Sequence, residues 1–161
     1  EAGKYFQAFP DYGPERMGAP IRAYTRISGS PIRQHCQITN PDLVVVLDPT
    51  LIGVVDITEG LKPDGALVVN TTLSPAELRA KLGLKHGRVY TVDASRIALD
   101  TIGRNIPNTP MIGALLRAVP AVSREGVIKV ALSRLGGKLS QKVADANVKA
   151  LELAFDQVKQ G

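Results

Sequence analysis

Two histidines and one cysteine are the side chains best suited to nucleophilic or metal chemistry, and their positions favour neither. His35 and Cys36 are neighbours in segment 32–38, whose alternating pattern predicts a strand. Because neighbouring strand residues point to opposite faces, these two do not form a catalytic pair. His86 lies in a short turn before Gly87. A single cysteine also excludes an internal disulfide and any structural zinc or iron–sulfur site built from several of the chain's own cysteines. We predict no catalytic residue and no metal ligand.

Polar residues follow three apolar segments, 43–47, 66–69 and 89–92, that read as strands covered on both faces. The polar clusters are Asp48, then Asn70-Thr71-Thr72, then Asp93-Ala94-Ser95. Helix signals between the segments indicate a parallel sheet with crossover helices, so all three clusters fall on one sheet edge. Open parallel sheets bind ligands at that edge. Two interpretations stay open: the clusters bind a ligand or partner, or they only cap the following helices.

The remaining elements extend this α/β pattern at both ends. Segment 5–9 reads as a strand, and a loop with three prolines follows at 10–20. Segments 21–27 and 32–38 alternate and predict an antiparallel hairpin. Helices are predicted to start near 75 and 94, after the apolar segments 66–69 and 89–92, and the last third reads as helices that start near 109, 123 and 138, the last continuing to the end. We predict a Rossmann-like three-layer domain over 1–161 with a mostly parallel sheet, a hairpin extension and a helical C-terminal third, whose first strand lies upstream of residue 1.

The formal net charge of +5 is concentrated in one stretch, 117–142, which holds six basic residues against one acid. They are Arg117, Arg124, Lys129, Arg134, Lys138 and Lys142. This basic block is either a solvated helix surface or a surface for phosphate, nucleic acid or an acidic protein. Five of the seven aromatic residues precede residue 25, which disfavours nucleic acid because stacking side chains are absent from the block. No stretch is apolar enough for a membrane helix or a secretory signal, so we expect a cytoplasmic protein.

A proline- and glycine-rich motif identifies a family resemblance. Phe9-Pro10, Gly13-Pro14-Glu15-Arg16 and Gly18-Ala19-Pro20, running into a strand, resemble the gamma subunit of the 2-oxoacid:ferredoxin oxidoreductases, such as pyruvate:ferredoxin oxidoreductase. Asp93-Ala94 and segment 108–115 are also similar, and the resemblance covers nearly the whole chain in order. The family usually begins with a strand, a Gly-x-Gly-Gly-Gln-Gly turn and a helix. The resemblance places these elements upstream of residue 1.

The resemblance implies a specific activity for the complex. The family decarboxylates a 2-oxoacid, here expected to be pyruvate, on thiamine diphosphate with Mg²⁺. It passes electrons through [4Fe–4S] clusters to ferredoxin and releases an acyl-coenzyme A. The thiamine-binding and ferredoxin-like subunits hold these cofactors, so this chain is expected to position coenzyme A and assemble the complex without catalysing alone. It is expected to bind neither nucleic acid nor membrane. The alternative is a free-standing α/β nucleotide-binding or interaction domain.

Two sets of candidate residues follow. Coenzyme A carries phosphates, which need uncharged donors and positive charge, and a helix N-terminus attracts anions. The candidate coenzyme A residues are Asn70, Thr71 and Thr72 at the sheet edge, with Arg104, Asn105 and Asn108 in the loop before a helix. A stiff proline-rich loop loses little entropy on docking. The candidate interface residues are therefore Pro14, Glu15, Arg16 and Met17.

Overall fold

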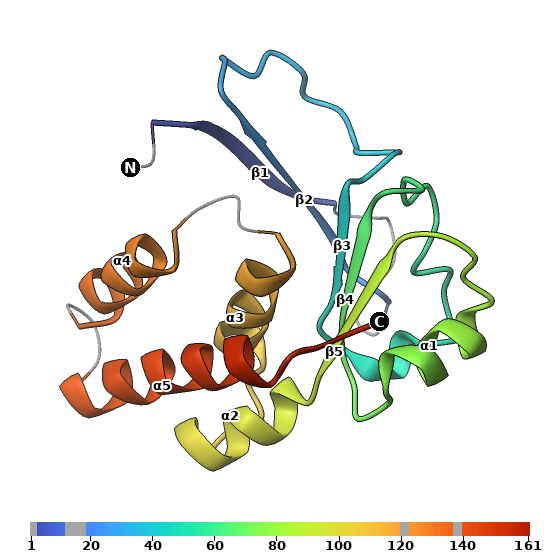
Figure 1. The fold of residues 1–161 in the computed structure, drawn as a ribbon. Coiled ribbons are helices and arrows are strands. Elements are labelled where there is room, and N and C mark those ends of the chain that lie inside the picture. The colour runs from blue at the N-terminus through green and yellow to red at the C-terminus, as the bar shows by residue number, and fades with distance from the viewer. Residues whose placement is uncertain (1–2, 12–18, 120–122, 137–139) are drawn as a thin grey trace. The chain divides into compact units, whose positions relative to one another are not determined.

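The protein forms two compact units, Glu1–Thr39 and Asn40–Gly161. The structure, a computed structural model, describes residues 3–11, 19–119, 123–136 and 140–161, with only the backbone described for 134–136 (Figure 1). No helix in these described ranges has both the length and the apolar character needed to cross a bilayer. That residues 1–161 act as a single domain stays a prediction.

The first unit is an antiparallel hairpin of β1 (Tyr5–Asp11) and β2 (Arg22–Ser28). The predicted hairpin partner of β2 is wrong, because residues 31–38 form no strand. Two features favour pairing with β1: a seven-residue register and a Phe9–Tyr24 ring contact with centroids 5.5 Å apart. Segment 32–38 is instead held to β2 by the Arg26 side chain. The Arg26 guanidinium donates to the carbonyls of Cys36 at 2.7 Å and Gln37 at 3.3 Å.

The second unit contains a four-stranded sheet in the order β3 (Leu43–Val46), β4 (Ala66–Asn70), β5 (Arg88–Val92), β6 (Lys159–Gln160). The first three strands are parallel, which confirms the three predicted strands and the mostly parallel sheet. All five residues of β4 are buried, as expected for a strand covered on both faces. The two-residue β6 runs antiparallel to β5 and was not predicted, because the sequence pattern indicated a helix to the end of the chain.

Helices follow the strands as the capping signals predict. They are η1 (Pro49–Leu51), α1 (Pro75–Leu82), α2 (Ala94–Ile102), α3 (Asn108–Ala118), α4 (Arg124–Gly136) and α5 (Gln141–Gln157). Ser74 and Glu77 form the expected capping box of α1. The Asp93 carboxylate accepts a hydrogen bond from the Arg96 N–H and so caps α2. The fold class is thereby confirmed as α/β with a helical C-terminal part.

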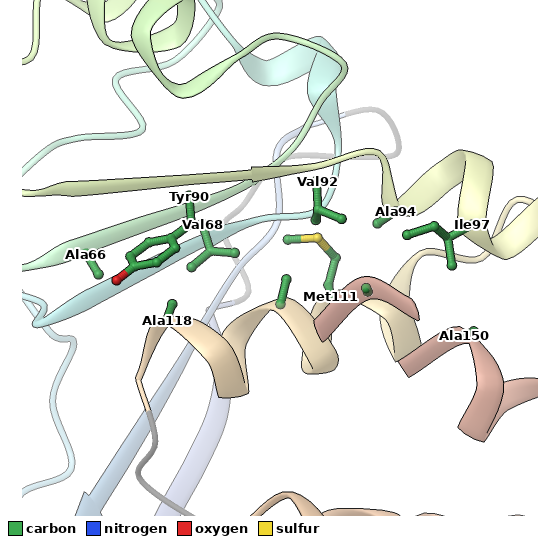
Figure 2. Close-up of a cluster of buried hydrophobic side chains, with 11 residues drawn as sticks. Ala66, Val68, Tyr90, Val92, Ala94, Ile97, Met111, Ala118 and Ala150 are labelled. Carbon is green, nitrogen blue, oxygen red and sulfur yellow. The ribbon is translucent and has the colours of Figure 1, made fainter. Parts of the chain in front are cut away.

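Two apolar clusters lie on opposite faces of the sheet. One packs α2, α3 and α5 against β4 and β5, and the other packs α1 and the segment after η1 against the opposite face. Figure 2 shows Met111 of α3 beside Val92, with Ala118 at the end of the cluster where Ala66 and Tyr90 lie. Helix α3 therefore runs opposite to β5, and its first residue, Asn108, lies toward the carboxyl end of the sheet.

Candidate functional site

The polar clusters lie at the carboxyl edge of the sheet, and much of their hydrogen-bonding capacity serves the fold. Asp48 caps η1, because its carboxylate accepts from the backbone N–H of Thr50 at 2.9 Å and from the Thr50 hydroxyl at 2.7 Å. These two bonds hold the pKa of Asp48 below its ordinary value, the hydroxyl bond having the larger effect. Asp93 caps α2 in a similar way. The capping interpretation thus accounts for both aspartates.

Asn70 joins the ends of three elements. Its side-chain NH₂ donates to the Leu47 carbonyl at 2.8 Å and to the Ser95 hydroxyl at 2.9 Å. Its side-chain oxygen accepts from the Ser95 backbone N–H at 3.2 Å. Only 1% of Asn70 is exposed, so these bonds form away from water. The residue therefore fastens β4 to the end of β3 and to the start of α2.

Replacing Asn70 by Ala should destabilise the fold by about 2–3 kcal/mol, because the Leu47 carbonyl and the Ser95 N–H lose the hydrogen bonds of a buried side chain that joins them. Urea denaturation followed by circular dichroism measures this change. Thr72→Ala is the matched control, since Thr72 is exposed on the same edge and its replacement should change stability by less than ~0.5 kcal/mol. Equal midpoints for the Asn70 variant and the native chain would show that these hydrogen bonds contribute nothing.

A pocket of about 420 Å³ opens at the ends of β4 and β5, beside β6. Its lining residues are Thr71, Thr72, Leu73, Thr91, Val92, Asp93, Gln157 and Lys159. Thr71 and Thr72 belong to the predicted set, whereas Thr91, Gln157 and Lys159 do not. Thr91 is detectable in the sequence as a polar residue inside an apolar strand. Lys159 has no such signal, because its position depends on the pairing of β6 with β5.

Charges around the pocket are partly neutralised within the protein. The Glu77 carboxylate accepts hydrogen bonds from the Ser74 hydroxyl at 2.6 Å and from the Ser74 N–H at 2.7 Å. These bonds, helped slightly by the charge of Lys159, hold the pKa of Glu77 below its ordinary value. Asp93 lies at the positive N-terminal end of α2, which offsets its charge. Positive charge in the pocket therefore comes from Lys159.

The other candidate residues, Arg104, Asn105 and Asn108, lie between α2 and the first turn of α3 and are exposed. None of them lines the pocket. The neighbouring Thr109 hydroxyl bonds the Asn147 side chain of α5 at 2.8 Å. Ten residues separate Asn147 from Gln157 at the pocket, which corresponds to about 15 Å along the helix. The two halves of the predicted set therefore lie at the same end of the sheet without forming one cluster.

Part of the basic block serves internal packing. The Arg117 and Arg124 guanidiniums lie 5.7 and 4.7 Å from the centre of the Phe155 ring, and Arg124 also pairs with Glu152 at 3.3 Å. Two of the six cations thus help to join α3 and α4 to α5. The side chain of Arg134 and all of Lys138 lie outside the described residues.

The remaining candidates give no further cluster. His35 Nδ1 lies 2.7 Å from the Gln7 side-chain nitrogen, and Cys36 is exposed. Across the described residues, no three His, Cys, Asp or Glu side chains gather as metal ligands would. The predicted interface residues Pro14, Glu15, Arg16 and Met17 lie outside the described residues.

Comparison with known proteins places the chain among oxidoreductase subunits. Residues 1–157 match the family described as "Pyruvate ferredoxin/flavodoxin oxidoreductase". The chain is 48% identical over 159 residues to pyruvate synthase subunit PorC of Thermotoga maritima, covering 99% of this chain and 82% of that protein. It is 46% identical over 155 residues to the pyruvate/ketoisovalerate oxidoreductases common subunit gamma of Thermococcus kodakarensis, covering 96% and 82%. A crystal structure of the T. maritima pyruvate oxidoreductase subunit PORC superposes with a TM-score of 0.84 at 44% identity, covering 99% and 83%.

Proposed function

Because this chain belongs to the pyruvate ferredoxin/flavodoxin oxidoreductase family, as a gamma-type subunit, we propose that it positions coenzyme A and assembles the complex that converts a 2-oxoacid to an acyl-coenzyme A. The family match over 157 residues carries this proposal. Pyruvate is the proposed 2-oxoacid, as in the printed name of the T. maritima relative. The alternative of an unrelated free-standing domain leaves 48% identity over 159 residues unexplained.

The proposed coenzyme A surface is the carboxyl edge of the sheet. Thr71 and Thr72 line a pocket there, and Arg104 and Asn105 lead into Asn108, the first residue of α3, at the same end. Asn70 supports this edge through its bonds to Leu47 and Ser95. Coenzyme A is a long molecule with phosphates at one end and a thiol at the other. The rise of about 15 Å along α5 from Asn147, which bonds Thr109 in the first turn of α3, to Gln157 at the pocket suits a single extended ligand.

Replacing Arg104 by Ala in the assembled complex should weaken coenzyme A binding by roughly 1.5–3 kcal/mol, the range for a hydrogen bond to a charged group. Decarboxylation before acyl transfer should be unaffected. Calorimetric titration of coenzyme A measures the affinity, and single-turnover carbon dioxide release measures the first step. The control is Arg96→Ala, which removes an exposed arginine of the preceding helix. Unchanged coenzyme A affinity with impaired assembly would make Arg104 an interface residue.

The proposed assembly surface is one face of the hairpin. Alternation places Phe6, Ala8 and Pro10 of β1 and Ala23, Thr25 and Ile27 of β2 on the same face. All six residues are exposed, and only Thr25 is polar. The opposite face holds the hydrogen-bonded side chains, including Gln7, Asp11 and Arg26. A two-stranded sheet is marginal by itself, so an apolar cover on this face would stabilise it.

The proposed cover belongs to partner subunits. The family resemblance implies a thiamine-binding subunit, which holds thiamine diphosphate and Mg²⁺, and a ferredoxin-like subunit, which holds [4Fe–4S] clusters and reduces ferredoxin. Pro14, Glu15, Arg16 and Met17, which stand between β1 and β2 in the sequence, remain predicted interface residues. We place the complex in the cytoplasm. The relatives in T. kodakarensis and Pyrococcus are named as common subunits of two oxidoreductases, which suits an assembly surface that can serve more than one complex.

A further inference from the structure

A column of polar residues ends the apolar face of the sheet that packs against α1. Leu67 and Val69 of β4 and Val89 of β5 are buried on this face. Two positions beyond Val69 and Val89 stand Thr71 and Thr91, so alternation places both on the same face. Lys159 of β6 is directly opposite Thr91 in the antiparallel pairing, and directly opposed side chains share a face. Three neighbouring strands thus bring a polar side chain to one end of this face.

The Thr91 hydroxyl has no structural task in the described part of the chain. Only 1% of Thr91 is exposed, it lines the pocket, and no hydrogen bond to its hydroxyl occurs among the described residues. No fully buried side-chain nitrogen or oxygen lacks a hydrogen-bond partner in the described part of the chain, and the Thr91 hydroxyl therefore reaches the pocket surface. The Thr71 oxygen accepts the Leu73 N–H at 3.2 Å, which leaves its hydroxyl proton free to donate. Both hydroxyls are therefore available to a molecule in the pocket.

The pocket lining holds one positive group, Lys159, and one negative group, Asp93. Lys159 lines the pocket and forms no ion pair within the described ranges, while the carboxylate of Asp93 already accepts the Arg96 N–H. An ammonium group beside two donating hydroxyls matches the oxygens of a phosphate or a carboxylate. Leu73 and Val92 add apolar surface for the rest of a small molecule.

We propose that this pocket binds the acidic group of a small molecule, with Lys159 as the counter-charge and Thr71 and Thr91 as hydrogen-bond donors. Two sources present this chemistry: a phosphate of coenzyme A, or a carboxylate of a small organic acid. The proposal goes beyond the predicted coenzyme A residues, because neither Lys159 nor Thr91 belongs to them. It also stands if coenzyme A binds only at the Arg104 loop, since a free organic acid fits the same groups.

Titration of the full-length protein with inorganic phosphate, coenzyme A and acetate, each followed by amide chemical shifts at residues 91 and 159, tests the proposal. At least one probe should bind with saturation. Its dissociation constant should rise at least tenfold in Lys159→Met and at least threefold in Thr91→Val. The control Lys149→Met removes an exposed cation of α5 outside the pocket lining and should leave the affinity unchanged. Thr91→Val should unfold at an equal or higher urea concentration than the native chain, which separates lost binding from lost folding.

Saturable binding of phosphate and coenzyme A without acetate supports the phosphate source, and binding of acetate supports the organic acid. Absence of saturation with all three probes overturns the proposal, as does a dissociation constant that Lys159→Met leaves unchanged. If Arg104→Ala weakens coenzyme A binding while Lys159→Met does not, the coenzyme A role stands and the pocket assignment fails. If Lys159→Met weakens coenzyme A binding while Arg104→Ala does not, the pocket assignment stands and the Arg104 loop is no longer part of the proposed coenzyme A site.

Discussion

Replacing Gly113 by Ala should destabilise the second unit by about 2–3 kcal/mol and can prevent folding, because α3 and α5 touch at this residue. A Cβ atom at Gly113 would overlap the Leu151 carbonyl oxygen and lie 2.9 Å from its carbonyl carbon. Both are main-chain atoms of α5, so the helices would have to separate. Alanine gains up to ~1 kcal/mol in helix propensity over glycine, but overpacking in a core costs typically 1–3 kcal/mol and more against backbone.

Chemical denaturation of the Gly113 variant measures this effect. Gly29→Ala is the matched control, because a Cβ there meets nothing within 4 Å and its backbone is not left-handed. The control should keep the native midpoint within ~0.5 kcal/mol. A Gly113→Ala variant as stable as this control would mean that α3 and α5 lie further apart than described.

Replacing Phe6 and Ile27 together by Ser should abolish or strongly weaken assembly of the complex without unfolding this chain. Phe6 is 78% exposed and Ile27 is 48% exposed, so neither contributes much to the core of the chain. Directly opposite in the hairpin register, they form one apolar patch. Truncating a buried aromatic anchor of an interface costs about 2 kcal/mol or more, which is roughly a 30-fold loss of affinity.

Co-purification with the partner subunits and sedimentation of the mixture measure this assembly. Val54→Ser is the matched control, since Val54 is 74% exposed and lies in the second unit. The control should assemble like the native chain. Full assembly of the Phe6 and Ile27 double variant would remove the hairpin face from the proposed interface and leave residues 14–17 as the remaining candidate.

Local sequence signals predicted the elements that depend on neighbouring residues. The Ser74–Glu77 capping box and the Asp93 cap form as expected, because a cap uses donors only two or three residues away. The three parallel strands were predictable from continuous apolar runs, which only a sheet covered on both faces accommodates. The proline- and glycine-rich motif after Phe9 carried enough family information to indicate the gamma-type subunit, which the family match bears out.

Distant pairings were decided only by the tertiary structure. Residues 32–38 alternate like a strand, yet β2 pairs with β1, because strand partners are chosen by competition between whole registers and not by a local pattern. The pairing of Lys159 with Thr91 spans 68 positions of the chain and has no local signal. This pairing places the Lys159 ammonium group beside the pocket. The amide of Asn70, predicted as a ligand donor, bonds Leu47 and Ser95 instead, since a buried amide takes the nearest partners that the fold supplies.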